Sequence, residues 1–174
     1  MALAVVGSRD VAASRQNMEI WRAVSADRGQ KLVRDFSDHS IAEACRWLAS
    51  GVSAEEAVRR FNKATMHESS AGLTIDMGRR ALARCAARKA DPATFMGELF
   101  AEAVSYYASR DLPSYVGAKG RVSNTSETIK LKDSLREATR ELVKSVGAPK
   151  LERAAWSSYI SSVLKVLQGG GTSK

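Results

Sequence analysis

The chain has 174 residues, 44% of them hydrophobic and 26% charged, and its formal net charge is +8. This length suits one domain or two small ones. No apolar run approaches the roughly 18 residues that a membrane-spanning helix needs, so we expect no membrane partner. A protein this basic favours polyanions such as nucleic acid, unless the charge serves only to keep it soluble.

Apolar residues recur at helical spacing along most of the chain. The pattern predicts a first helix over 10–27 and a second over 40–50, which ends at Gly51. A third helix begins at Ser53, where Ser53 and Glu56 have the spacing of a capping box. The cysteines of the chain, Cys45 and Cys85, fall on apolar helix faces. We expect them to be buried free thiols, which suits a reducing cytoplasm.

The second half of the chain continues this helical pattern. Helices are predicted over 74–89, from Pro92 to about 110, over 126–146 and over 149–167, with a loop at 110–125 and a disordered tail at 169–174. The expected fold is all-α: a bundle of about six to seven helices with a short N-terminal arm. It would form one domain over 1–168, for which 1–90 and 91–168 are the alternative halves.

The N-terminal stretch LAVVGSRD is open to a second interpretation. A strand that ends in Gly7-Ser8-Arg9 is similar to the first strand of nucleotide-binding Rossmann-like domains. Such domains need further strands that alternate with helices, and the pattern predicts none. A short arm is therefore the preferred interpretation of this stretch, although a strand stays open.

The residue types that carry catalysis or bind metal are scarce. His39, Cys45, His67 and Cys85 are the whole supply of soft ligands, and their spacing matches no zinc motif. There is no nucleophile elbow, P-loop or paired His/Glu motif. We therefore expect no enzymatic activity, no cofactor and no metal.

Residues 46–61, RWLASGVSAEEAVRRF, are similar to part of the helix-turn-helix of transposase-type DNA-binding domains. In those domains an apolar turn residue and a recognition helix follow. Here Lys63 stands where the apolar turn residue is required, and Glu68 where the recognition helix buries an aliphatic side chain. A helix-turn-helix that reads bases is therefore disfavoured.

Positive charge is concentrated in two segments. Residues 51–90 and 119–150 each hold eight basic and four acidic residues, whereas residues 91–118 hold one basic and four acidic residues. Within the first segment, Arg80, Arg84 and Arg88 are spaced by four and share one helix face. Asp76 is placed to pair with Arg80, but Arg84, Arg88 and Lys89 have no local acid. We therefore expect these four residues to follow a phosphate backbone, with a merely solubilising face as the alternative.

Other basic residues have acids at helical spacing and are expected to be neutralised. The expected pairs are Glu55–Arg59, Glu56–Arg60, Asp133–Arg136, Glu137–Arg140 and Glu141–Lys144. Lys130 and Lys132 have no such downstream acid and join the candidate nucleic-acid contacts.

The 110–125 segment supplies two more candidates. Lys119 and Arg121 lie among Gly117 and Gly120, where the backbone can approach a phosphate closely. Tyr115 is placed to stack on a base. An ordinary flexible connector is the alternative for this segment.

In size, basic charge, helical pattern and lack of catalytic residues, the chain resembles the small helical subunits of CRISPR effector complexes, which serve antiviral defence. That resemblance implies a non-catalytic, cytoplasmic ribonucleoprotein subunit that stacks in several copies beside a guide RNA and helps hold a DNA strand. The contacts would be to the RNA or single-stranded DNA backbone, without sequence readout. Two alternatives stay open: a DNA-binding regulator, partition or packaging protein that uses residues 40–70, and a protein–protein adaptor that binds no nucleic acid.

Overall fold

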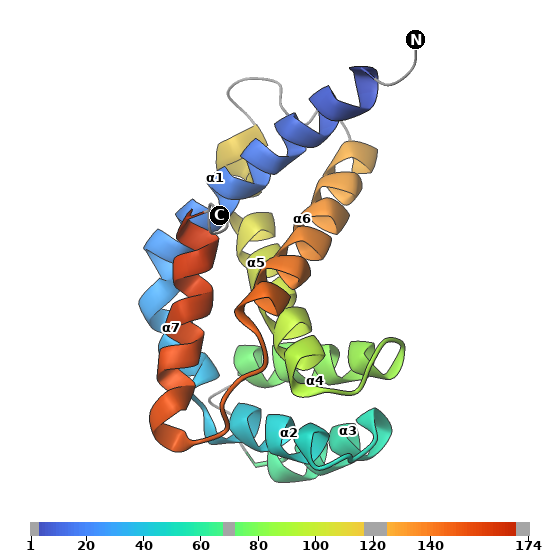
Figure 1. Cartoon of the computed structure of the whole chain (residues 1–174), viewed down its shortest axis with the longest axis vertical. Coiled ribbons are helices and arrows are strands. Elements are labelled where there is room, and N and C mark those ends of the chain that lie inside the picture. Colours follow the sequence, from blue (N-terminus) through green and yellow to red (C-terminus); the bar gives the residue numbers. More distant parts are fainter. Residues whose placement is uncertain (1–3, 68–71, 117–124, 170–174) are drawn as a thin grey trace.

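A computed structural model describes residues 4–67, 72–116 and 125–169, with side chains described for these except at 4–16, 111–116, 125 and 127. Over these ranges the chain forms α-helices and no strand, so the predicted all-α bundle is confirmed (Figure 1). The helices are α1 (Ala4–Phe36), α2 (His39–Ala49), α3 (Ala54–Ala64), α4 (Gly72–Ala86), α5 (Pro92–Val116), α6 (Thr125–Val146) and α7 (Arg153–Gly169).

Three helices have a boundary that lies four or more residues from the sequence-based expectation. The first helix is longer at both ends, and LAVVGSRD is helical from Ala4 onward, so neither the expected short arm nor the alternative strand is found there. Its C-terminal extension follows the apolar face, because Leu32 and Phe36 are buried one turn apart. Helix α5 continues to Val116, through part of the expected 110–125 loop. The last helix begins at Arg153 instead of at Pro149.

Four local signals for the start or end of a helix are confirmed, those at Gly51, Ser53, Asp91 and Gly147. Gly51 and Gly147 follow α2 and α6 with φ of +85° and +90°, the left-handed region that favours glycine. Ser53 and Asp91 cap the helices that follow them. Their side-chain oxygens accept the backbone N–H three residues on, at 3.2 and 2.8 Å.

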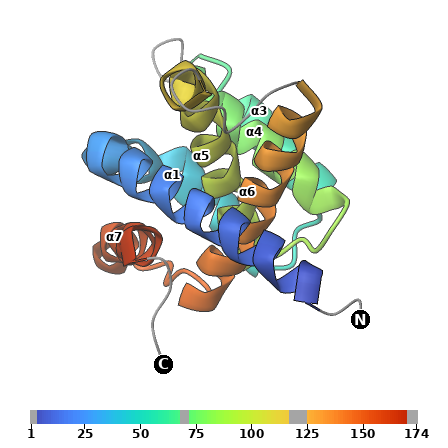
Figure 2. The ribbon, with the colours of Figure 1, turned by 90° about the horizontal axis from the view of Figure 1, so that it is seen from above.

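Helix α5 lies at the centre of the bundle and contacts α1, α2, α4 and α6. One hydrophobic core holds residues of all seven helices, and α5 contributes buried Phe95, Met96, Leu99 and Phe100 to it. Helices α1 and α7 pack side by side (Figures 1 and 2), while α2 and α3 lie across the end of the bundle beneath α4. This arrangement leaves one flank of α5 between α4 and α6, where the charged residues gather.

Two tryptophans fix the long first helix to the rest of the bundle. The indole Nε1 of Trp21 donates to Thr139 Oγ1 at 2.9 Å, which ties α1 to α6. The indole Nε1 of Trp156 donates to the carbonyl oxygen of Phe36 at 2.8 Å, which ties α7 to the end of α1. Each hydrogen bond satisfies an N–H that is buried with its ring.

The described helices also bear on membrane and metal binding. None of them is long and apolar enough to cross a bilayer. No group of three or more His, Cys, Asp or Glu side chains within the same ranges is placed to hold a metal ion. Both cysteines are free and buried, as expected. Burial raises the pKa of the Cys45 thiol and raises that of Cys85 to about 12.

Candidate nucleic-acid interface

Helix α5 carries two glutamates on the flank that lies between α4 and α6. Glu98 and Glu102 are one turn apart, and their side chains are only 1% and 7% exposed. An unpaired carboxylate buried this deeply would lose its hydration without compensation. Each of the two is therefore expected to need a basic partner, and the structure supplies two for each.

Glu102 lies between an arginine of α4 and an arginine of α6. The Nε of Arg84 is 2.8 Å from Glu102 Oε1, and Nη2 of Arg136 donates to the same oxygen. Arg136 is mostly buried, whereas Arg84 is 47% exposed. The carboxylate therefore anchors one inner and one outer guanidinium.

Glu98 repeats this arrangement one turn away. The Nε of Arg88 lies 3.1 Å and the Nε of Arg140 lies 2.8 Å from Glu98 Oε1. Arg140 Nη2 also donates to Glu98 Oε2 at 3.2 Å. Exposed Glu137 joins from α6, at 2.7 Å from Arg140 and 3.4 Å from Arg88. The Arg–Glu cluster, as we name it, consists of Arg84, Arg88, Glu98, Glu102, Arg136 and Arg140.

The expectation that Arg84, Arg88 and Lys89 have no acidic partner is wrong. The partners of the two arginines come from α5 and α6, which the spacing within α4 cannot reveal. Lys89 pairs with Asp91, the cap of α5, at 3.2 Å. The two arginines nevertheless keep about half of their surface exposed.

Arg80 was expected to pair with Asp76, and the structure does not show this pair. Asp76 pairs with Arg79 at 2.8 Å instead of with Arg80, and Arg79 also donates to Asn62 at 2.6 Å. Arg80 is exposed, and it forms no ion pair with any side chain that the structure describes. Among the described side chains it is therefore an unpaired cation, one turn before Arg84.

The remaining candidates divide into two groups. Lys130 and Lys132 lie on α6, and neither forms an ion pair within the described ranges, in keeping with the sequence-based interpretation. Lys119 and Arg121 lie in 117–124, outside the described residues, and the side chain of Tyr115 is also outside them. The candidate interface described by the structure therefore does not include these three residues.

Three of the five predicted pairs do not form as expected: two change partners, and Glu141 and Lys144 form no ion pair within the described ranges. Glu137 pairs with Arg140 as expected, whereas Arg136 pairs with Glu102 of α5 in place of Asp133. On α3, Glu56 alone holds both arginines, at 2.6 Å from Arg59 and 2.9 Å from Arg60. The hydrogen bond from Arg60 is the main cause that lowers the pKa of the Glu56 carboxyl.

Beside Glu98, the Arg–Glu cluster opens onto a cavity of about 340 Å³. The cavity lies where the end of α4, the start of α5 and the last turns of α6 meet. Its basic lining residues come from both positive segments of the sequence: Arg88, Lys89, Arg140 and Lys144. Acids at Asp91, Glu98 and Glu141 also line it.

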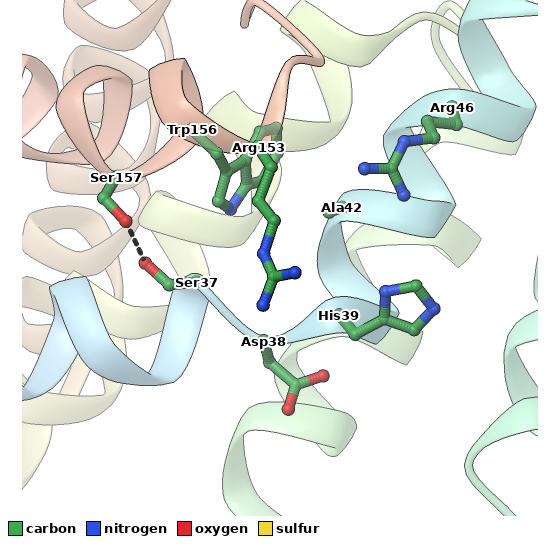
Figure 3. A pocket seen from close by; sticks show the side chains of 8 residues that line it. All are labelled: Ser37, Asp38, His39, Ala42, Arg46, Arg153, Trp156 and Ser157. Carbon is green, nitrogen blue, oxygen red and sulfur yellow. Dashed lines mark hydrogen bonds between the residues drawn. The ribbon is translucent and has the colours of Figure 1, made fainter.

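A second cavity, of about 730 Å³, lies between the start of α2 and the start of α7 (Figure 3). Its charges are largely engaged, because Arg46 pairs with Glu43 and the Asp38 carboxylate caps α2 through Ser40 N–H. Arg153 reaches into it and forms no ion pair with a described side chain. One free cation is a weaker attraction for a polyanion than the α4–α6 flank offers.

Sequence reasoning missed the acidic half of the Arg–Glu cluster. A signal was nevertheless present, since Glu98 and Glu102 stand one turn apart within a stretch that is otherwise strongly apolar, PATFMGELFAEAV. A charged residue on a buried helix predicts a tertiary partner. The two glutamates in the sequence do not show which arginines pair with them.

Comparison of the chain with known protein families, with curated proteins and with solved structures found no match. The chemistry of the described residues therefore carries the functional argument.

Proposed function

We propose that this chain is a non-catalytic helical subunit of a nucleoprotein complex. It binds the sugar–phosphate backbone of RNA or single-stranded DNA without reading sequence, and other helix faces pack against neighbouring protein subunits. The observation that supports the proposal most strongly is the Arg–Glu cluster, in which buried carboxylates fix half-exposed arginines on one flank of the bundle.

A fixed arginine is a better phosphate ligand than a mobile one. Each guanidinium has five N–H donors, and the Glu102 contact of Arg84 is made through Nε, which leaves the terminal amino groups for an outer ligand. Because Glu102 already restrains the Arg84 side chain, less conformational entropy is lost when a phosphate binds. Arg88 presents a second guanidinium about 6 Å farther along α4, although its Nη2 also donates to Glu137 at 3.4 Å.

Free cations next to the Arg–Glu cluster make this flank positive. Arg80 continues the α4 series by one turn, and Lys132 continues the α6 series by one turn. Neither forms an ion pair with a side chain in the described ranges. Charge that is not neutralised within the fold is available to displace counterions from a nucleic-acid backbone.

The proposed phosphate contacts imply binding without sequence readout. Arginine and lysine contacts to phosphate position a nucleic acid but carry no base information. The predicted base-reading alternative depended on Arg59 and Arg60, and Glu56 binds both of these. Residues 40–70 therefore offer less free positive charge than the α4–α6 flank does.

The test compares two double variants with equal changes in charge. Arg80→Gln/Lys132→Gln removes two cations without an ion-pair partner in the described structure, so the fold is expected to persist. Arg59→Gln/Arg60→Gln is the matched control on α3. Binding of a labelled 20-nucleotide RNA of random sequence is measured by fluorescence anisotropy across a salt series.

The first variant should weaken RNA binding and reduce the slope of log K against log salt by about 1.4, because each lost phosphate contact on a single strand removes about 0.7. The control should change the slope much less. Equal losses in both variants, or a larger loss in the control, would contradict this interface and favour residues 40–70.

A further inference from the structure

The α5 face that carries the two buried glutamates continues to an aromatic residue. Glu98, Glu102 and Tyr106 stand at successive turns, so their side chains share one face of the helix. Tyr106 is 41% exposed, although its chain neighbour Tyr107 is only 3% exposed. An aromatic ring is thus presented to solvent at the end of the Arg–Glu cluster.

Neighbouring side chains hold the Tyr106 ring. It makes an edge-to-face contact with Tyr107, with ring centroids 5.2 Å apart and planes at 80°. Arg28 of α1 lies over the Tyr107 ring, 5.6 Å from its centroid. The inner ring is therefore fixed by a buried contact, and the outer ring rests against it with surface left to bind a ligand.

The spacing of the ion pairs along α5 and α6 puts a further cation, Lys132, one helical turn beyond Arg136 on the side of the Arg–Glu cluster away from Glu98. Arg140 pairs with Glu98 and Arg136 pairs with Glu102, so each turn forward on α5 meets a turn backward on α6. Continuing the same four-residue spacing by one turn leads to Tyr106 on α5 and to Lys132 on α6. On α4 the steps from Arg88 to Arg84 lead on to Arg80.

We propose that Tyr106 stacks on an unpaired base while Arg84, Arg80 and Lys132 contact the neighbouring phosphates. The site would thus take single-stranded nucleic acid in preference to a duplex, because bases paired in a duplex do not present a free face to a side chain. This inference rests on the proposed function and adds the residue through which the α4–α6 flank would favour an unpaired strand.

The combination of groups favours a nucleic-acid strand over an acidic protein surface. An acidic peptide would satisfy the cations, but it would give the exposed ring no planar partner. Base stacking is independent of base identity, since every base has a π face. It therefore agrees with a binder that does not read sequence.

The test uses Tyr106→Leu and Tyr106→Phe in the full chain, with the 20-nucleotide RNA and a 20-base-pair DNA duplex as probes. Leucine keeps an apolar side chain but removes the ring, whereas phenylalanine keeps the ring. Tyr106→Leu should weaken RNA binding by about 5- to 150-fold, the range that loss of one stacked base produces. Tyr106→Phe should bind RNA like the wild type, and neither substitution should alter duplex binding.

The salt slope separates this inference from the proposed function. Loss of stacking lowers the affinity at every salt concentration and leaves the slope unchanged, because no phosphate contact is removed. An unchanged affinity of Tyr106→Leu, beside a reduced slope in Arg80→Gln/Lys132→Gln, would overturn the stacking site while the proposed function stands. If the wild-type protein bound neither probe, both would fail.

A second measurement does not depend on the affinity and detects the stacking contact itself. An RNA that carries 2-aminopurine at successive positions loses fluorescence on contact with an aromatic ring. Quenching in complex with the wild type, removed by Tyr106→Leu and retained by Tyr106→Phe, is the expected result. Equal quenching in all three proteins would contradict stacking on Tyr106.

Discussion

The Nε of Arg84 lies 2.8 Å from Oε1 of Glu102, although the two residues are in different helices and Glu102 is almost fully buried. One partner thus reaches solvent and the other lies inside the bundle. The contact has two consequences: it compensates a buried charge, and it fixes an outer guanidinium. The first consequence concerns stability and the second concerns ligand binding, so they can be tested separately.

Glu102→Ala should destabilise the fold. The substitution leaves mostly buried Arg136 without its carboxylate partner, and breaking a buried ion pair costs about 3–5 kcal/mol of unfolding free energy. Chemical denaturation with urea, followed by circular dichroism, measures the change. Glu141→Ala, at an exposed glutamate on α6 without an ion pair in the described ranges, is the control and should change stability by about 0.5 kcal/mol or less. Equal effects of the two substitutions would contradict the role assigned to Glu102.

Gly78→Ala should also destabilise the fold, through overpacking. A Cβ at Gly78 would lie 2.7 Å from Phe61 Cζ and 3.0 Å from Ile41 Cδ1, and both side chains are fully buried. Overpacking of this kind costs about 1–3 kcal/mol. Gly72→Ala is the matched control, because a Cβ there meets no atom within 4 Å. The midpoint of thermal unfolding should be lower for Gly78→Ala than for Gly72→Ala.

Trp156→Phe should cost stability because it leaves the Phe36 carbonyl oxygen without the indole donor. An unsatisfied buried polar group costs about 1–3 kcal/mol, beyond the loss of ring volume. Trp47→Phe serves as the comparison, since Trp47 is only partly buried and has no hydrogen-bond partner for its indole among the described residues. A loss for Trp47→Phe as large as that for Trp156→Phe would show that ring volume alone is responsible.

Because the Cys85 thiol is buried, we expect the free energy of unfolding to decrease at alkaline pH. Burial raises the pKa of Cys85 to about 12, while an unfolded thiol ionises near pH 8.5. Between these values the unfolded state has released a proton that the folded state retains, so rising pH favours unfolding. The unfolding free energy of the wild type should fall above pH 9, and that of the Cys85→Ala variant should fall less.

A thiol reagent at pH 8 should react with both cysteines in urea but only slowly in the folded protein.

Local signals in the sequence were sufficient for the helices and insufficient for the interface. The turn at Gly51 and the caps at Ser53 and Asp91 depend on neighbours within a few residues, so their sequence predicts their structure. The partners of Arg84 lie on α5, and no spacing within α4 encodes them. Arg88 likewise pairs with residues of two other helices.

The candidate residues for nucleic-acid contact likewise depend on packing between helices. By local spacing Arg80 is the one member of its series with an acid to pair with, yet Asp76 pairs with Arg79, and Arg80 has no ion pair among the described residues. Tyr106 could not be distinguished by its spacing from the buried aromatic residues of α5. Only the packing of α5 against its neighbours shows that Tyr107 faces inward while Tyr106 stays exposed.

The most direct test of nucleic-acid binding is the affinity of the wild-type protein for single-stranded RNA of random sequence, measured by anisotropy from about 25 to 300 mM salt. We predict binding at low salt that weakens steeply, with a slope of about −2 to −4, since roughly three to six phosphate contacts each contribute about −0.7. RNAs of different sequence should bind alike. Absence of binding at 25 mM salt, or an affinity that does not change with salt, would contradict the account.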